Sequence, residues 1–148
     1  MSTIEQTQTT IQVYQVFIKA TPEAVWDAIT KPEFTKRFFY GAEIDATADR
    51  RLVKMGDDVG EDPIFEFDPP RRLVHGWSSK WNDEMAAEEP SRVTWEIEPR
   101  DDGITLLTLV HDRLEGAPKT ATAVYGQGWM MVLSGLKTLL ETGEPLSS

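Results

Sequence analysis

The chain has 148 residues, of which 40% are hydrophobic and 27% charged, and its formal net charge is −10 with an isoelectric point near 4.6. This length and apolar content are typical of one globular domain with a single core. Because nucleic acids and anionic lipids bind proteins largely through Lys and Arg, the acidic balance excludes both as expected partners.

The N-terminal region is expected to lead into the domain through one strand. Residues 1–8 are polar and aperiodic, which predicts a disordered lead. The run Thr10–Ile18 is rich in Val, Ile, Tyr and Phe, which predicts a first strand. We expect a single domain over residues 9–143, followed by a short tail over residues 144–148.

Two helix-start signals follow the first strand. Thr21–Glu23 supplies an N-cap threonine, a proline at the first helical position and an acid in the first turn, so a helix should run from here to about Ile29. Lys31–Glu33 carries a second proline start and predicts a short helix that ends near Phe38 or Phe39. Two short helices in tandem are therefore expected after strand one.

Beyond Tyr40 the hydrophobic pattern changes to period two, with Pro and Gly between the runs. Turn signals such as Asp101–Gly103 favour antiparallel hairpins over crossover units. The segment Trp81–Pro90 indicates a long acidic hairpin loop. The strand candidates are Ala42–Asp45, Arg51–Met55, Ile64–Asp68, Arg72–Trp81, Ser91–Glu98 and Ile104–His111.

The stretch Thr120–Glu141 predicts one long amphipathic helix. Its apolar residues recur at helical spacing and form a single stripe that must be buried: Tyr125, Trp129, Val132, Leu133, Leu136, Leu139 and Leu140. Gly128 and Gly135 lie seven residues apart on one flank of this helix. Their missing side chains either admit a closely packed strand or leave volume for a ligand, and the sequence leaves both readings open.

Alternation along the strands assigns one face of the sheet to aromatic and aliphatic side chains. A long apolar helix is the natural cover for such a face, which predicts a two-layer α+β domain. The residues assigned to this concave face are Phe65, Phe67, Leu73, His75, Trp77, Val93, Trp95, Ile97, Leu107, Leu109 and His111.

Several segments together resemble a known family over nearly the whole chain, from about Val13 to Glu141. They are Ala20–Trp26, Phe38–Tyr40, Phe67–Leu73, Ser91–Glu96 and Gly128–Trp129 with Leu133 and Leu136. The chain resembles the START-like, helix-grip superfamily, in the branch similar to the C-terminal domain of activators of the Hsp90 ATPase and to small stand-alone bacterial members.

This resemblance implies a curved antiparallel sheet of about seven strands, wrapped round a long C-terminal helix. It also implies a cavity between helix and sheet, which in relatives holds lipids, polyketides or other apolar small molecules. The chain departs from the eukaryotic activators in lacking a separate chaperone-binding domain, so we do not expect a chaperone partner. It also has Phe38-Phe39 where the family usually has a tryptophan pair.

The concave face, two tyrosines and the C-terminal helix supply the expected ligand-binding residues. These are Tyr40, Phe65, Phe67, His75, Trp77, Trp95, Leu109, His111, Tyr125, Gly128, Trp129 and Val132. The tyrosine hydroxyls would orient a carbonyl or hydroxyl of the ligand, or alternatively bond the backbone. The tryptophans are equally compatible with a core role.

Only two residues are candidates for catalysis. His75 and His111 are the candidate acid/base groups, because imidazole titrates near neutral pH; the alternative is that each is a hydrogen-bonded core residue. No nucleophile elbow or phosphate-binding loop is present. Two histidines are too few for a zinc site. The acidic residues over 57–62 lack the ligand order of a calcium loop and indicate a solvated turn. We therefore expect no metal and no cofactor.

Three functional hypotheses follow. The first is binding of an apolar or aromatic small molecule in the cavity, without chemistry. The second is an enzyme of cyclase, dehydratase or hydrolase type that uses a cavity histidine. The third is a co-chaperone-like interaction module that acts through its acidic surface and the loop over residues 82–90. A homodimer is compatible with all three.

Overall fold

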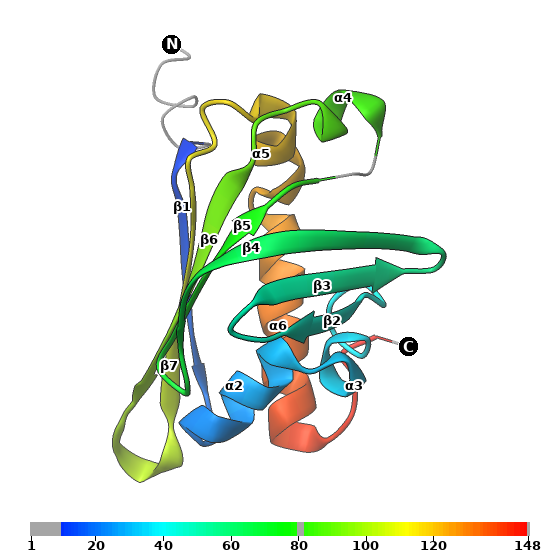
Figure 1. The fold of residues 1–148 in the computed structure, drawn as a ribbon. Helices are drawn as coiled ribbons and strands as arrows, with labels where there is room; N and C mark the ends of the chain where they lie inside the picture. Colours follow the sequence, from blue (N-terminus) through cyan, green and yellow to red (C-terminus); the bar gives the residue numbers. More distant parts are fainter. Residues whose placement is uncertain (1–9, 80–81, 148) are drawn as a thin grey trace.

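The computed structural model describes residues 10–79 and 82–147, and its centre is a seven-stranded antiparallel sheet that curves around the last helix (Figure 1). The strand order is β1-β7-β6-β5-β4-β3-β2, so the first strand lies beside the last. The strands are β1 (Gln12–Ile18), β2 (Glu43–Ala46), β3 (Arg50–Met55), β4 (Asp58–Asp68), β5 (Arg72–Trp77), β6 (Ser91–Pro99) and β7 (Thr105–Asp112). The predicted α+β helix-grip fold is confirmed.

The two helices after strand one begin where the sequence indicates. Thr21 is the N-cap of the first, and its hydroxyl accepts a hydrogen bond from the Ala24 amide at 3.1 Å. None of the helices in the described part of the chain has the length and hydropathy needed to cross a bilayer. The helices are α2 (Pro22–Thr30), α3 (Pro32–Thr35), α4 (Asp83–Ala86), the short 3₁₀ turn η1 (Asp101–Gly103), α5 (Pro118–Val124) and α6 (Gln127–Thr142).

The core lies between α6 and the concave face of the sheet. Trp95 and Leu107 from the strands meet Trp129 and Leu136 from α6, and all four are at most 2% exposed. The helices α2 and α3 cover the end of this layer near the carboxyl end of α6 (Figure 1). The sheet and helix therefore bury their apolar faces against each other, as their sequence periods predict.

The single C-terminal helix predicted over Thr120–Glu141 is wrong. The chain forms two helices, α5 and α6, with a break at Tyr125 and Gly126. Gly126 has φ 63° and ψ −106°, a conformation that glycine adopts at little cost and that ends α5. The break also moves Tyr125 out of the predicted stripe, and its side chain is 46% exposed.

Of the predicted solvated turn over residues 57–62, only Asp57 lies in a turn, although Asp58 and Glu61 are also exposed. The strand β4 begins at Asp58, well before the predicted Ile64, and its first half pairs with β3. Asp62 is only 7% exposed, because it pairs with a buried arginine of β3. Pairing with β3 thus holds this polar segment in a strand, although its sequence has no apolar alternation.

The long acidic loop predicted over Trp81–Pro90 contains a helical turn. The Asn82 side chain accepts a hydrogen bond from the Met85 amide at 2.8 Å and begins α4. Met85 is buried on the inner side of this turn. The predicted strand Arg72–Trp81 ends at Trp77; its last two residues, 80–81, and the predicted N-terminal lead over 1–8 lie outside the described residues.

A β-bulge in β4 corrects the face assigned to Phe65. Ile64 pairs with His75 and Phe67 with Leu73, so the register shifts between them. Phe65 consequently lies on the outer face beside Gly76, 56% exposed, while Ile64 takes the inward position. A bulge places two residues opposite one, which breaks the period-two assignment.

Candidate ligand-binding pocket

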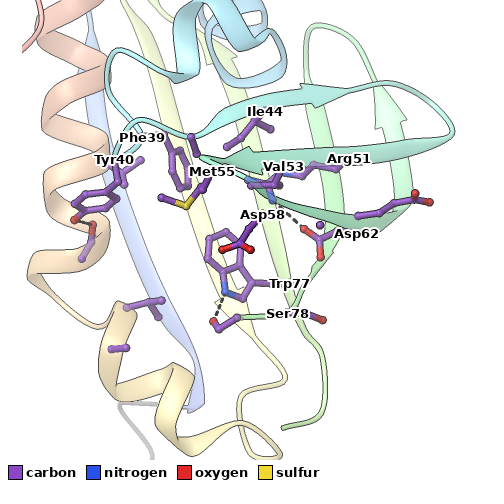
Figure 2. Close-up of a pocket in the computed structure, with 18 of the residues that line it drawn as sticks. Phe39, Tyr40, Ile44, Arg51, Val53, Met55, Asp58, Asp62, Trp77 and Ser78 are labelled. Carbon is purple, nitrogen blue, oxygen red and sulfur yellow. Dashed lines mark hydrogen bonds and ion pairs between the residues drawn. The ribbon is translucent and has the colours of Figure 1, made fainter. Parts of the chain in front are cut away.

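A pocket of about 600 Å³ lies between the two C-terminal helices and the β2–β4 part of the sheet (Figure 2). This volume is within the range of small-molecule sites. The aromatic and aliphatic residues on its wall are Phe39, Tyr40, Ala42, Ile44, Val53, Met55, Val59, Trp77, Ala123, Val124, Trp129 and Val132.

The β3–β4 hairpin supplies the outer wall through simple alternation. Arg51, Val53 and Met55 are two residues apart on β3 and face the pocket together. Arg51 pairs directly with Asp62 across the hairpin, and Val53 pairs with Gly60. All four residues line the pocket, so the register of this hairpin places the ion pair beside Val53 on the wall.

A buried ion pair sits in this wall. The Arg51 Nη1 atom lies 3.0 Å from the Asp62 Oδ2 atom, and the two side chains are 3% and 10% exposed. The guanidinium carbon is 5.9 Å from the centre of the Phe39 ring and 5.4 Å from that of Trp77. Burial lowers the pKa of Arg51, whereas the Asp62 carboxylate raises it. The pair thus brings a charged but compensated hydrogen-bonding group to an otherwise aromatic wall.

Trp77 is the centre of the aromatic part of the pocket. Its ring lies 5.3 Å from that of Trp129 and 6.3 Å from that of Phe39, both tilted. Its Nε1–H donates a hydrogen bond to the Ser79 hydroxyl at 3.0 Å. That bond satisfies the indole and fixes its plane against the open space.

Tyr40 closes one side of the pocket through backbone contacts. Its hydroxyl donates a hydrogen bond to the Gly128 carbonyl at 3.0 Å, although its side chain is 58% exposed. Gly128 lies on the wall, and a Cβ there would be 3.1 Å from the Ala123 carbonyl oxygen. At Gly135 a Cβ would be 3.2 Å from the Cβ of Phe38. Gly135 therefore serves close packing, while Gly128 both borders the pocket and packs against α5.

His75 lies in the core, off the pocket wall. Its Nε2 atom accepts a hydrogen bond from Trp95 Nε1–H at 3.0 Å. The remaining ring proton must then be on Nδ1, which donates to the Gly76 carbonyl at 2.7 Å. Burial, reinforced by the charge of Arg51, lowers the pKa of His75 well below its ordinary value of 6.5. The ring is neutral and both its nitrogens are bonded.

His111 repeats this arrangement with the opposite ring nitrogens. Its Nδ1 atom accepts from Trp129 Nε1–H at 3.1 Å, and its Nε2–H donates to the Ser91 hydroxyl at 2.8 Å. Burial lowers the pKa of His111 to about 3. Each histidine is therefore a neutral acceptor for a buried indole, and neither has a free nitrogen directed at the pocket.

The predicted ligand-binding residues divide between the pocket and other places. Phe67 packs edge-on against Trp26 with ring centres 5.1 Å apart, and Phe65 and Tyr125 lie on the outer face and at the helix break. Those that line the pocket are Tyr40, Trp77, Gly128, Trp129 and Val132. Those in the core behind it are His75, Trp95, Leu109 and His111.

Sequence reasoning missed the contribution of the β3–β4 hairpin. Asp62 belongs to the predicted solvated turn, and Arg51 was predicted only as the first residue of a strand, with no face assigned. One signal was available: Arg51, Val53 and Met55 alternate with polar residues, which places the arginine on the same strand face as two apolar side chains. Phe39 was not among the predicted ligand-binding residues, and it also lies on the wall.

The family model described as "Activator of Hsp90 ATPase homolog 1-like protein" matches residues 19–141. The chain belongs to this family. Comparison with curated proteins finds no match to this family member.

Solved structures of bacterial proteins share the fold of this family member. Protein MLL2253 from Mesorhizobium loti is 22% identical with a TM-score of 0.72, over 88% of this chain and 96% of its own. CalU16 from Micromonospora echinospora is 24% identical with a TM-score of 0.69, over 93% of this chain and 77% of its own. DynU16, a protein of the dynemicin biosynthetic locus, is 25% identical with a TM-score of 0.72; the match covers 92% of this chain and 49% of DynU16.

Proposed function

We propose that this protein binds an apolar or aromatic small molecule in the pocket between α5–α6 and β2–β4. The observation that carries the proposal is the pocket itself, with about 600 Å³ of space beside Trp77, Phe39 and Val53. Exposed residues such as Tyr40, Met55 and Val59 line this pocket, so its apolar wall is in contact with water. A ligand that occupies the space would remove that apolar surface from water, which is favourable.

The comparisons support a small-molecule role at a coarser level. The family and its fold are compatible with a cavity under the C-terminal helix. DynU16 is described as a protein of a biosynthetic locus, which sets one relative beside small-molecule metabolism. The ligand-binding role of the individual wall residues is part of the proposal.

The other two hypotheses gain no specific support. A catalytic histidine would need a free nitrogen at the pocket, whereas His75 and His111 are buried with both nitrogens bonded. The interaction hypothesis used the acidic segment after β5. There the Glu88 carboxylate accepts hydrogen bonds from the Lys119 and Thr120 amides and joins this segment to the start of α5.

The test is binding of the neutral fluorophore N-phenylnaphthylamine, measured by the change in its fluorescence emission. Cell extracts that compete with the dye are then analysed for the bound compound by native mass spectrometry. Ala123 is an exposed residue of α5 on the pocket wall. Ala123→Trp should place a ring in the entrance and weaken dye binding at least tenfold. Native spectra of protein purified gently from its source should show a retained small-molecule adduct.

Thr122→Trp is the matched control. It adds the same ring one residue away on α5, at an exposed position that is not on the pocket wall. It should bind the dye as the parent protein does. If the parent protein fails to bind the dye and carries no adduct, or if both variants behave alike, binding in this pocket is ruled out.

A further inference from the structure

The Arg51–Asp62 pair offers hydrogen-bond donors to whatever occupies the pocket. Within the described residues, the side-chain hydrogen bonds of Arg51 are limited to the one from Nη1 to Asp62. The described residues also contain no fully buried side-chain nitrogen or oxygen that lacks a partner. The other guanidinium nitrogens must therefore reach accessible space, and Arg51 borders the pocket. An arginine carries five N–H donors, so several remain for a ligand.

Stacking keeps these donors in place. The guanidinium lies over the rings of both Phe39 and Trp77, at 5.9 Å and 5.4 Å from their centres. Asp62 holds it from the side, across the β3–β4 hairpin (Figure 2). A planar ligand against Trp77 would meet the guanidinium at its edge, where an oxygen atom accepts best.

The charge around the pair selects the kind of oxygen. Asp62 already compensates the single positive charge of Arg51. Asp58 borders the same pocket, and Glu61 faces Arg50 at 3.6 Å on the exposed side of the hairpin. A ligand carboxylate would place a second negative charge at this guanidinium, on a wall whose described residues also include the carboxylate of Asp58, in a chain of net charge −10. Like charges at short range in a desolvated site repel strongly.

From this arrangement we infer that the pocket selects uncharged aromatic ligands that carry a carbonyl-type oxygen, and that it rejects the corresponding carboxylates. The inference rests on the proposed function and narrows it to a ligand class. Arg51 supplies the attraction for the oxygen, and Asp62 supplies the discrimination against anions. Specificity of this kind combines a favourable contact with a repulsive one.

Three probes of the same ring and nearly the same size test the inference by titration calorimetry at pH 7. Acetylnaphthalene carries a ketone, naphthoate a carboxylate and ethylnaphthalene neither, each at the same ring position. The parent protein should bind the ketone roughly tenfold more tightly than the hydrocarbon, as expected for one hydrogen bond to a charged donor. It should bind naphthoate at least tenfold more weakly than the ketone.

Two variants test the separate contributions of Arg51 and Asp62 to ligand selectivity. Asp62→Asn removes the negative charge and keeps a hydrogen-bonding side chain, and it should strengthen naphthoate binding by about tenfold or more. The double variant Arg51→Met with Asp62→Leu replaces the pair by apolar side chains of similar size. It should bind ethylnaphthalene and acetylnaphthalene equally, and its folding does not depend on an unpaired buried charge.

The outcomes distinguish this inference from the proposed function. If the parent protein binds none of the three probes, the proposed function fails, and this inference fails with it. If the parent protein binds all three equally, or naphthoate best, ligand binding stands and the inference is overturned. Retention of the ketone preference in the double variant would also overturn it, because the preference would then arise from another part of the wall.

Discussion

The two halves of the sheet use similar residue types for different purposes. In the β5–β7 half, Trp95 and Trp129 meet His75 and His111, and every indole and imidazole nitrogen has a partner inside a filled core. Beside the β2–β4 half, Arg51 of β3 borders about 600 Å³ of space together with Trp77 at the end of β5, and guanidinium donors remain available. Polar groups next to filled volume thus stabilise the fold, whereas those next to open volume are candidates for recognition.

The largest contrast between the halves should appear in stability. Trp95→Ala removes a side chain that is 2% exposed and also leaves the His75 acceptor without its indole donor. Loss of a buried tryptophan should lower the free energy of unfolding by about 4 kcal/mol, measured by urea denaturation. In the open half, Val59→Ala changes a side chain that is 65% exposed and should stay within about 0.5 kcal/mol. Similar losses for both variants would remove the distinction between the halves.

The ion pair should matter for stability only when it is broken. Arg51→Met removes the buried cation from the Arg51–Asp62 ion pair and should lower the free energy of unfolding by about 3 kcal/mol. The double variant with Asp62→Leu should return to within about 1 kcal/mol of the parent protein, because it buries no unpaired charge. Urea denaturation of the parent protein, both single variants and the double variant measures this coupling. A double variant as unstable as the single ones would make the pair a structural element of the fold.

The packed half should make stability depend on pH. Burial holds the pKa of His111 at about 3 and that of His75 well below 6.5, so the unfolded chain binds protons more readily than the folded one. The full stability is present above pH 6.5 and is lost as the pH falls from there toward about 3. Between pH 7.5 and 5.5, above the range where most carboxylates titrate, the two histidines together should remove about 3 kcal/mol.

Denaturation at several pH values, together with proton NMR of the imidazole rings, measures this dependence. The chain has only two histidines, so their signals can be followed individually. In the folded protein neither should titrate down to pH 5.5. A ring that titrates near its ordinary pKa would show that it is open to solvent, and would return it to the candidates for catalysis.

The packed half was also the more predictable from sequence. Period-two alternation placed Leu73, Trp95 and Leu109 on the concave face, because these strands pair regularly and bury one side against a helix. The break at Gly126 was not predictable from the apolar stripe, since its spacing continues across the break.

The open half was less predictable, because its features depend on contacts between strands. The register that pairs Arg51 with Asp62 comes from a hairpin whose β4 side carries little apolar alternation. The bulge at Phe65 reverses the face of one residue without any marker such as glycine. The sequence does contain the alternation of Arg51 with Val53, which indicates the strand face on which Arg51 lies. It does not indicate that Asp62 is the partner of Arg51.

The smallest expected effect concerns the link between the two halves. The Tyr40 hydroxyl donates to the Gly128 carbonyl at 3.0 Å and so joins the loop before β2 to the first turn of α6, beside the pocket. Tyr40→Phe removes this one partly exposed hydrogen bond and should lower the free energy of unfolding by about 1 kcal/mol or less. Tyr125→Phe makes the same change at a hydroxyl that forms no side-chain hydrogen bond within the described residues, and it should have no measurable effect. Hydrogen exchange should show faster opening at the start of α6 in the Tyr40 variant alone, because only there does the pocket lose a contact that fixes its edge. Equal exchange in the two variants would mean that packing alone holds the start of α6 in place, and that the Tyr40 hydrogen bond is not needed to keep the shape of the pocket.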